Sequence, residues 1–134
     1  MSDLVEQLRR EHSEIVRSLD RVKAHRPTSQ EGRAELRASR AGLLAHLATE
    51  DAELYPVLLA AAASDPAVAR VVASFSADAE AISRFADDFF QRYEHGADDG
   101  VDFARDFAAL YAMLKNRIRR EEEQLYAEYE RLRG

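Results

Sequence analysis

Four long stretches of the sequence each carry an apolar stripe with the three- and four-residue spacing of an α-helix. Such spacing keeps one face of a helix turned toward a core. Near its middle, each stripe is interrupted by ionisable residues, which are His12, His46, Glu50, Asp78, Arg117 and Glu121. A helix with one apolar stripe must bury it against other helices, so the chain is constrained to a helical bundle with a polar layer across its centre.

The first two helices are each predicted to open with a capping box, in which a side chain at the helix start and a Glu three residues later bind backbone N–H groups. One helix is predicted over residues 3–25, before the sequence HRPTS. The next is predicted over about 28–63, with a kink at Pro56. The capping pairs are Asp3 with Glu6 and Thr28 with Glu31.

The third helix is predicted to begin with Asp65 as N-cap and Pro66 at the first helical position, and to end near the segment EHGADDG at 94–100. The fourth runs from about Val101 to the C-terminus. Four helices of similar length joined by short links predict an all-α fold, an antiparallel up-down-up-down four-helix bundle. We expect residues 1–134 to form it as one domain.

The composition argues against several classes of protein. The chain has 134 residues and no cysteine, which excludes disulfides and thiolate metal sites. Its net charge is −6 and its basic residues are scattered, so it has no basic face for nucleic acid. The apolar runs are too short to span a bilayer, and the sequence MSDLVEQLRR has no signal-peptide core. We therefore expect a cytoplasmic protein that binds neither nucleic acid nor membranes.

The polar layer must be neutralised, because an unpaired buried charge costs several kcal/mol. Its three carboxylates and one arginine leave a charge of −2 when both histidines are neutral. One divalent cation would cancel this charge, and imidazole with carboxylate is a ligand set that suits zinc, iron or manganese. Protonation of both histidines would cancel it equally well and leave a metal-free salt-bridge network. The residues by themselves are compatible with both.

At these positions the sequence resembles the hemerythrin-like, or HHE cation-binding, family. REHSEIVRSLDRV, at 10–22, looks like the family's first ligand motif, and HLATEDAELYPVL, at 46–58, is similar to its H-x-x-x-E signature. The resemblance covers nearly the whole chain and implies a four-helix bundle that holds two irons, bridged by two carboxylates and capped by histidines. It implies that the ligands of one iron are retained, as His12, His46, Glu50 and Glu121.

The sequence departs from this pattern at the second iron. Arg117 stands where the family's fourth helix carries a histidine, and the third helix has Asp78 or Ala81 in place of its central histidine. We therefore expect one divalent metal, iron or zinc, with Arg117 as a fixed cation in place of the other. An intact di-iron centre and reversible oxygen binding are not expected. The candidate metal ligands are His12, His46, Glu50, Glu121 and Asp78.

Two classes of function are consistent with this pattern. The first is a metal-binding module that senses or stores metal, oxygen or an oxidant, as the resemblance implies. The second is a metal-free helical interaction protein whose polar core is a salt-bridge network. An enzyme is not expected, because no nucleophile with an adjacent base is evident.

Several aromatic residues add further hypotheses. Tyr55 and Tyr126 occupy matching places after Glu50 and Glu121, and act either as hydrogen-bond donors to these carboxylates or as core residues with a solvated hydroxyl. The aromatic residues Phe75, Phe85, Phe89 and Phe90 are most simply part of the core, although two phenylalanines fall partly off the apolar stripes and are candidate contacts of a homodimer. These two are Phe90 and Phe103.

Overall fold

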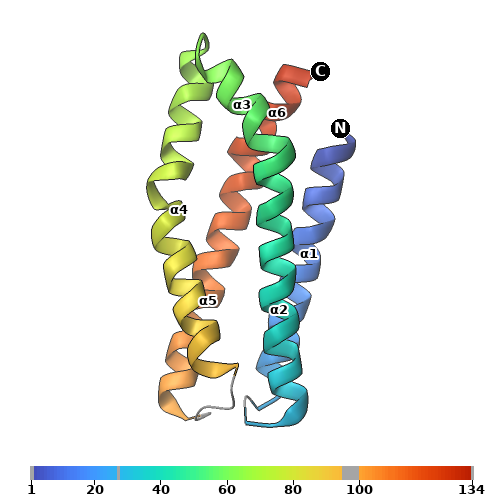
Figure 1. The fold of residues 1–134 in the computed structure, drawn as a ribbon, viewed down its shortest axis with the longest axis vertical. Coiled ribbons are helices and arrows are strands. Elements are labelled where there is room, and N and C mark those ends of the chain that lie inside the picture. Colours follow the sequence, from blue (N-terminus) through green and yellow to red (C-terminus); the bar gives the residue numbers. More distant parts are fainter. Residues whose placement is uncertain (1, 27, 95–99, 134) are drawn as a thin grey trace.

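The computed structural model describes residues 2–26, 28–94 and 100–133, which form four helical rods packed side by side (Figure 1). The rods are, in order, α1 (Asp3–Ala24); α2 (Gln30–Thr49) with the π-helical turn η1 (Glu50–Leu54) and α3 (Tyr55–Ala62); α4 (Pro66–Tyr93); and α5 (Val101–Arg120) with the π-helical turn η2 (Glu121–Leu125) and α6 (Tyr126–Arg133). Successive rods run in opposite directions, so the start of α1 and the end of α6 lie at the same end of the bundle (Figure 1). The described residues contain no strand. The predicted all-α antiparallel bundle is confirmed.

Two of the helix starts differ by one residue from the prediction. Ser2, rather than Asp3, caps α1, because its Oγ accepts the backbone N–H three residues further on at 3.2 Å. At α2 the cap is Ser29 rather than Thr28, and its Oγ accepts the backbone N–H of Gly32 at 2.9 Å. In both places the cap is the residue with extended backbone directly before the helix, from which a short side chain reaches the first-turn N–H groups. Asp65 caps α4 as predicted.

The second and fourth rods each contain one π-helical turn, and each turn begins at a glutamate of the polar layer, Glu50 in η1 and Glu121 in η2. The sequence predicted a kink at Pro56, and the irregularity that the structure shows is η1, directly before α3. No proline follows η2, so proline is not the shared cause. A π turn adds a residue to one helical turn and rotates the side chains that follow. After η1, Leu58 is buried and its neighbour Val57 is only partly buried, whereas an unbroken 3.6-residue repeat from Leu54 would favour both equally.

The apolar core consists of two clusters that lie on either side of the polar layer. One cluster contains Ile15, Leu19, Val22, Leu36, Ala86, Phe89, Phe90, Tyr93, Phe103, Phe107, Leu110 and Leu114. The other contains Val5, Leu8, Leu54, Leu58, Val68, Val72, Phe75, Leu125, Tyr126 and Tyr129. Along α1, His12 separates Leu8 of one cluster from Ile15 of the other. The polar residues are therefore enclosed by apolar side chains toward both ends of the bundle.

Two predictions about the outer surface can be compared with the structure. Phe90 and Phe103 are 2% and 8% exposed, and both rings pack against Phe89 at centroid distances of 5.4 and 5.9 Å. Both belong to the core, so the alternative interpretation of them as homodimer contacts was wrong, and dimerisation of the chain stays a prediction. No helix within the described ranges combines the length and the apolarity needed to cross a bilayer.

Candidate metal centre

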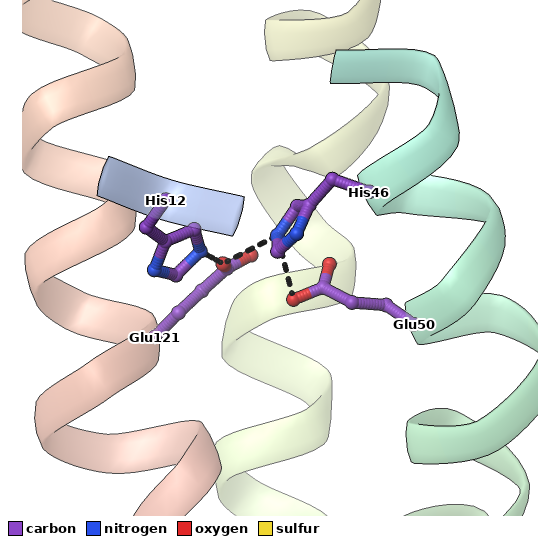
Figure 2. A group of neighbouring side chains, drawn as sticks. All are labelled: His12, His46, Glu50 and Glu121. Atoms are coloured by element: carbon purple, nitrogen blue, oxygen red, sulfur yellow. Dashed lines mark hydrogen bonds and ion pairs between the residues drawn. The ribbon is translucent and has the colours of Figure 1, made fainter. Parts of the chain in front are cut away.

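The bundle brings four of the five predicted ligands together at its middle (Figure 2). These residues are His12, His46, Glu50 and Glu121, which we call the four-residue cluster. They come from three of the four rods, and none of them is more than 3% exposed. One donor atom from each side chain lies within 4.8 Å of the others. The rings of both histidines approach the Glu121 carboxylate (Figure 2). Side chains far apart in the sequence therefore form one buried group.

Glu121 is the centre of the cluster. Its Oε1 lies 2.9 Å from His12 Nε2 and 3.8 Å from His46 Nε2. Its Oε2 accepts a hydrogen bond from Arg117 Nε at 3.1 Å. His46 Nε2 also lies 3.2 Å from Glu50 Oε2. One carboxylate thus contacts both imidazoles and a guanidinium, and the second carboxylate contacts one of the same imidazoles.

Two glutamates that the sequence analysis did not identify hold the other nitrogen of each imidazole. His12 Nδ1 lies 2.7 Å from Glu122 Oε2, and His46 Nδ1 lies 2.8 Å from Glu11 Oε1. A carboxylate only accepts, so each Nδ1 carries a proton and each Nε2, which faces Glu121, is the atom available to a metal. Glu11 and Glu122 are partly exposed and sit next to the apolar stripes, where a charged residue is usually solvated. The one signal for them in the sequence is that each adjoins a predicted ligand.

Asp78, the fifth predicted ligand, does not join the four-residue cluster. Its carboxylate is 37% exposed and forms ion pairs with Arg117 and with Arg120, the latter at 2.6 Å. The guanidinium of Arg117 lies over the ring of Phe75 and contacts both Asp78 and Glu121. The planar fork of an arginine suits such a bridge between two carboxylates. Arg117 therefore separates Asp78 from the histidines, and the alternative residue, Ala81, is exposed.

Tyr126 places a hydroxyl inside the cluster. The residue is fully buried, and its hydroxyl donates a hydrogen bond to Glu50 Oε2 at 2.6 Å. The same oxygen lies 3.0 Å from His12 Nε2 and 3.2 Å from Glu121 Oε1. Of the two predicted roles, donation to a carboxylate is confirmed for Tyr126. The hydroxyl of Tyr55, its counterpart after η1, instead accepts a hydrogen bond from a neighbouring guanidinium at 3.5 Å.

The protonation of the cluster follows from burial and from these contacts. Burial opposes the charged form of His46, but its carboxylate partners outweigh burial and raise its pKa to about 10. Burial would raise the pKa of Glu121, yet the two imidazoles and the neighbouring guanidinium lower it below its usual range. Burial and the charge of Glu121 raise the pKa of Glu50. Burial also raises the pKa of Tyr126, together with both carboxylate charges. Without metal, the cluster therefore contains an imidazolium, an ionised Glu121 and a protonated phenol.

The geometry of the four-residue cluster is compatible with a bound metal ion. In an octahedron with bonds of about 2.1 Å, opposite ligands are about 4.2 Å apart and neighbouring ligands about 3 Å, so the observed spread of up to 4.8 Å would have to contract on binding. His46 Nε2 is buried and makes no hydrogen bond with any residue that the structure describes. Buried polar atoms normally have a partner, and a cation would supply one here. A cavity of about 60 Å³, lined by His12, His46 and Glu121 among other residues, adjoins these atoms.

The fold and the site together define a four-helix bundle that carries a buried cluster of histidines and carboxylates between its helices. Comparison with family profiles agrees, because the profile described as "Hemerythrin HHE cation binding domain" matches residues 3–129. The chain therefore belongs to the hemerythrin HHE cation-binding domain family, and the predicted resemblance is confirmed. No curated protein and no solved structure gives a significant match.

Proposed function

We propose that the four-residue cluster binds a single divalent metal ion, iron or zinc. The ligands are His12, His46, Glu50 and Glu121. The main support is that four buried donors converge, among them His46 Nε2, which makes no hydrogen bond with a described residue and faces inward because Glu11 holds the opposite ring nitrogen. Membership of a cation-binding family supports the same conclusion.

The position of Arg117 supports one metal rather than a pair. Its Nε–H donates a hydrogen bond to Glu121 Oε2, the oxygen that would otherwise be free to bridge to a second ion. The same guanidinium is held by the backbone oxygen of Phe75 at 2.9 Å and by Asp78. An arginine keeps its charge at every physiological pH, so it repels a second cation from this side of Glu121. Arg117 thus takes the electrostatic place of the family's second metal.

The proposed role is storage or sensing of metal, oxygen or an oxidant. When bound, the ion would supply a Lewis-acidic or redox-active centre, which no side chain of the cluster provides. A groove of about 700 Å³ between the second rod and α4 is lined by Glu50, Tyr55 and Arg117. It is a route from solvent to the cluster for an ion or a small molecule.

A metal-free interaction protein is the second candidate, because the cluster is able to neutralise its own charge. With a pKa of about 10, His46 is an imidazolium at neutral pH and lies close to the carboxylates of Glu50 and Glu121. A buried network of this kind holds helices in register when every charge has a partner. The two candidates differ in whether an ion replaces the proton of His46.

Metal content decides between the candidates. The chain is purified without a histidine tag, exposed to iron(II) or zinc in turn, freed of excess metal and analysed. We expect about one ion per chain for the wild type and a large loss for His46→Ala. His25→Ala is the matched control, because His25 is an exposed residue at the end of α1 and should leave the metal content unchanged.

Less than about 0.2 metal per chain in the wild type and in His46→Ala alike would remove the metal proposal and favour the salt-bridge network. Absorption after anaerobic iron loading and exposure to air tests the number of ions. Oxo-bridged di-iron bands would overturn the single-metal site. Circular dichroism of each variant shows whether the bundle is intact, so that a lost ligand is distinguished from a lost fold.

A further inference from the structure

We infer that the phenol oxygen of Tyr126 is a fifth protein ligand of the metal, and that it makes the site selective for a trivalent ion, above all iron(III). This inference rests on the proposed metal site and extends it. It concerns which oxidation state the bundle holds most tightly.

The position of the hydroxyl is that of a ligand atom. It lies 2.6 Å from Glu50 Oε2, 3.0 Å from His12 Nε2 and 3.2 Å from Glu121 Oε1. Neighbouring ligands in an octahedron are about 3 Å apart when each bond is about 2.1 Å. The hydroxyl of Tyr126 stands at ligand-to-ligand distance from three donors of the cluster.

The surrounding structure holds the phenol in this place. Tyr126 directly follows η2, the π-helical turn that begins at Glu121, so the two side chains are five residues apart and still reach the same group. The phenol ring stacks on the ring of His12, with centroids 5.4 Å apart and an interplanar angle of 15°. The residue is 0% exposed, so its hydroxyl is not directly solvated.

The first half of the chain contains a natural comparison. Tyr55 follows Glu50 and η1 just as Tyr126 follows Glu121 and η2. Its hydroxyl has one hydrogen bond with a described residue, from Arg117 Nη2 at 3.5 Å, and none with the four-residue cluster. Two tyrosines at equivalent places in the sequence thus differ in one respect, which is contact with the proposed ligands.

The donor set that includes the phenol matches a trivalent ion in charge. Two carboxylates carry −2, which balances a divalent ion, and a phenolate brings the ligands to −3. Both imidazoles act as neutral donors once His46 has lost its Nε2 proton, and the three oxygens are hard ligands that favour a small, highly charged cation. On binding, the phenolic O–H bond and the Nε2–H bond of His46 would break, O–Fe and N–Fe bonds would form, and both protons would pass to the buffer. Iron enters already as iron(III), so no electron is transferred.

The test uses the whole chain loaded with iron(III) nitrilotriacetate and freed of excess reagent. We expect one iron per chain, a phenolate-to-iron(III) charge-transfer band in the visible spectrum, and tyrosine ring modes enhanced in resonance Raman spectra. Tyr126→Phe should lose both signals and should weaken the binding of iron(III) about 10-fold to 100-fold, and more than it weakens the binding of zinc. Tyr55→Phe is the matched control and should keep both signals.

Wild-type protein that holds one iron without the charge-transfer band would overturn this inference and leave the metal site standing. So would a band that survives in Tyr126→Phe. Wild-type protein that binds neither iron nor zinc would overturn both proposals. If Tyr126→Phe does not fold, the test uses wild-type and Tyr55→Phe proteins grown with ring-deuterated tyrosine. Enhanced Raman modes whose frequencies shift on deuteration in both proteins come from a tyrosine other than Tyr55 and support ligation by Tyr126. Enhanced modes that do not shift refute it.

Discussion

Replacement of Arg117 by methionine tests whether this guanidinium stabilises the buried Glu121 carboxylate. Methionine keeps an unbranched side chain of similar reach and removes the charge and the donors. Arg120→Met is the matched control, because both guanidinium groups pair with Asp78 and lie over the ring of Phe75, at 4.6 and 4.8 Å. Of the two arginines, Arg117 alone also donates to Glu121, at 3.1 Å.

The contacts that Arg117 and Arg120 have in common contribute little to the free energy of unfolding. Asp78 is 37% exposed and its pairs are screened by water, so this pair and the ring contact together contribute about 1–2 kcal/mol to each arginine. The Glu121 side chain is only 4% exposed. Breaking a buried pair costs about 3–5 kcal/mol, and the two imidazoles that remain beside Glu121 reduce this toward the lower end. We expect Arg117→Met to lose about 3 kcal/mol more stability than Arg120→Met, or about 9 °C more in Tm.

Urea denaturation at pH 7 with a metal chelator, followed by circular dichroism, measures both losses. The slopes of the free energy of unfolding against urea should match the wild type, since the exposed surface is unchanged. The double variant Arg117→Met with Glu121→Gln should lose less stability than the two single losses added together, because both single changes break the same Arg117–Glu121 contact. Equal losses for the two arginine variants, within about 0.5 kcal/mol, would refute the reasoning.

Three further predictions concern the metal, the pH dependence and the helix backbone. Glu11→Ala should weaken metal binding about 10-fold to 100-fold, and Glu11→Gln by less, because Glu11 holds His46 Nδ1 at 2.8 Å. Competition with a chromophoric chelator measures both affinities, and an unchanged value for Glu11→Ala would contradict the tautomer assignment. Because the pKa of His46 is raised to about 10, a metal must displace its proton, so affinity should rise by up to about tenfold per pH unit from pH 7 to 9. In the metal-free chain, the proton on His46 stabilises the fold fully below about pH 6.5, and this stabilisation is lost as the pH rises through 10. Denaturation at several pH values across this range measures the effect. A stability that does not change with pH would exclude the pairing of His46 with the carboxylates. Gly32→Ala should lower the Tm, because the added Cβ would overlap the backbone oxygen of Arg26. Gly42→Ala has open space around its Cβ and should raise the free energy of unfolding by about 0.5–1 kcal/mol. The reverse order of melting temperatures would be inconsistent with both arguments.

Much of the bundle and most of the candidate site were predictable, because both depend on local periodicity. The apolar stripes assigned one face of each helix to the core, and ionisable residues on that face had to meet wherever the helices crossed. His12, His46 and Glu121 lie on such stripes and do meet. Whether a residue lies on a stripe depends only on the residues three and four places away along the same helix. It can therefore be predicted from the sequence without knowing how the rods pack.

The contributions of Glu11 and Glu122 could not be derived in this way. They lie beside the stripes, where the same residue type usually faces water, and they reach the histidines only because of how closely α1 packs against its neighbours. Asp78 shows the opposite case. It lies on a predicted stripe, yet two arginines hold it at the edge of the site.

Tyr55 and Tyr126 show most clearly which features depend on local sequence and which depend on tertiary packing. Tyr55 and Tyr126 follow equivalent glutamates, so any rule based on spacing along the chain treats them alike. The hydroxyl of Tyr126 reaches three donors of the cluster, and that of Tyr55 reaches Arg117. Periodicity along the chain sets the face on which a side chain stands, because backbone geometry repeats. Which atoms meet across the bundle depends on the π turns and on the distances between rods, and those are properties of the packed molecule.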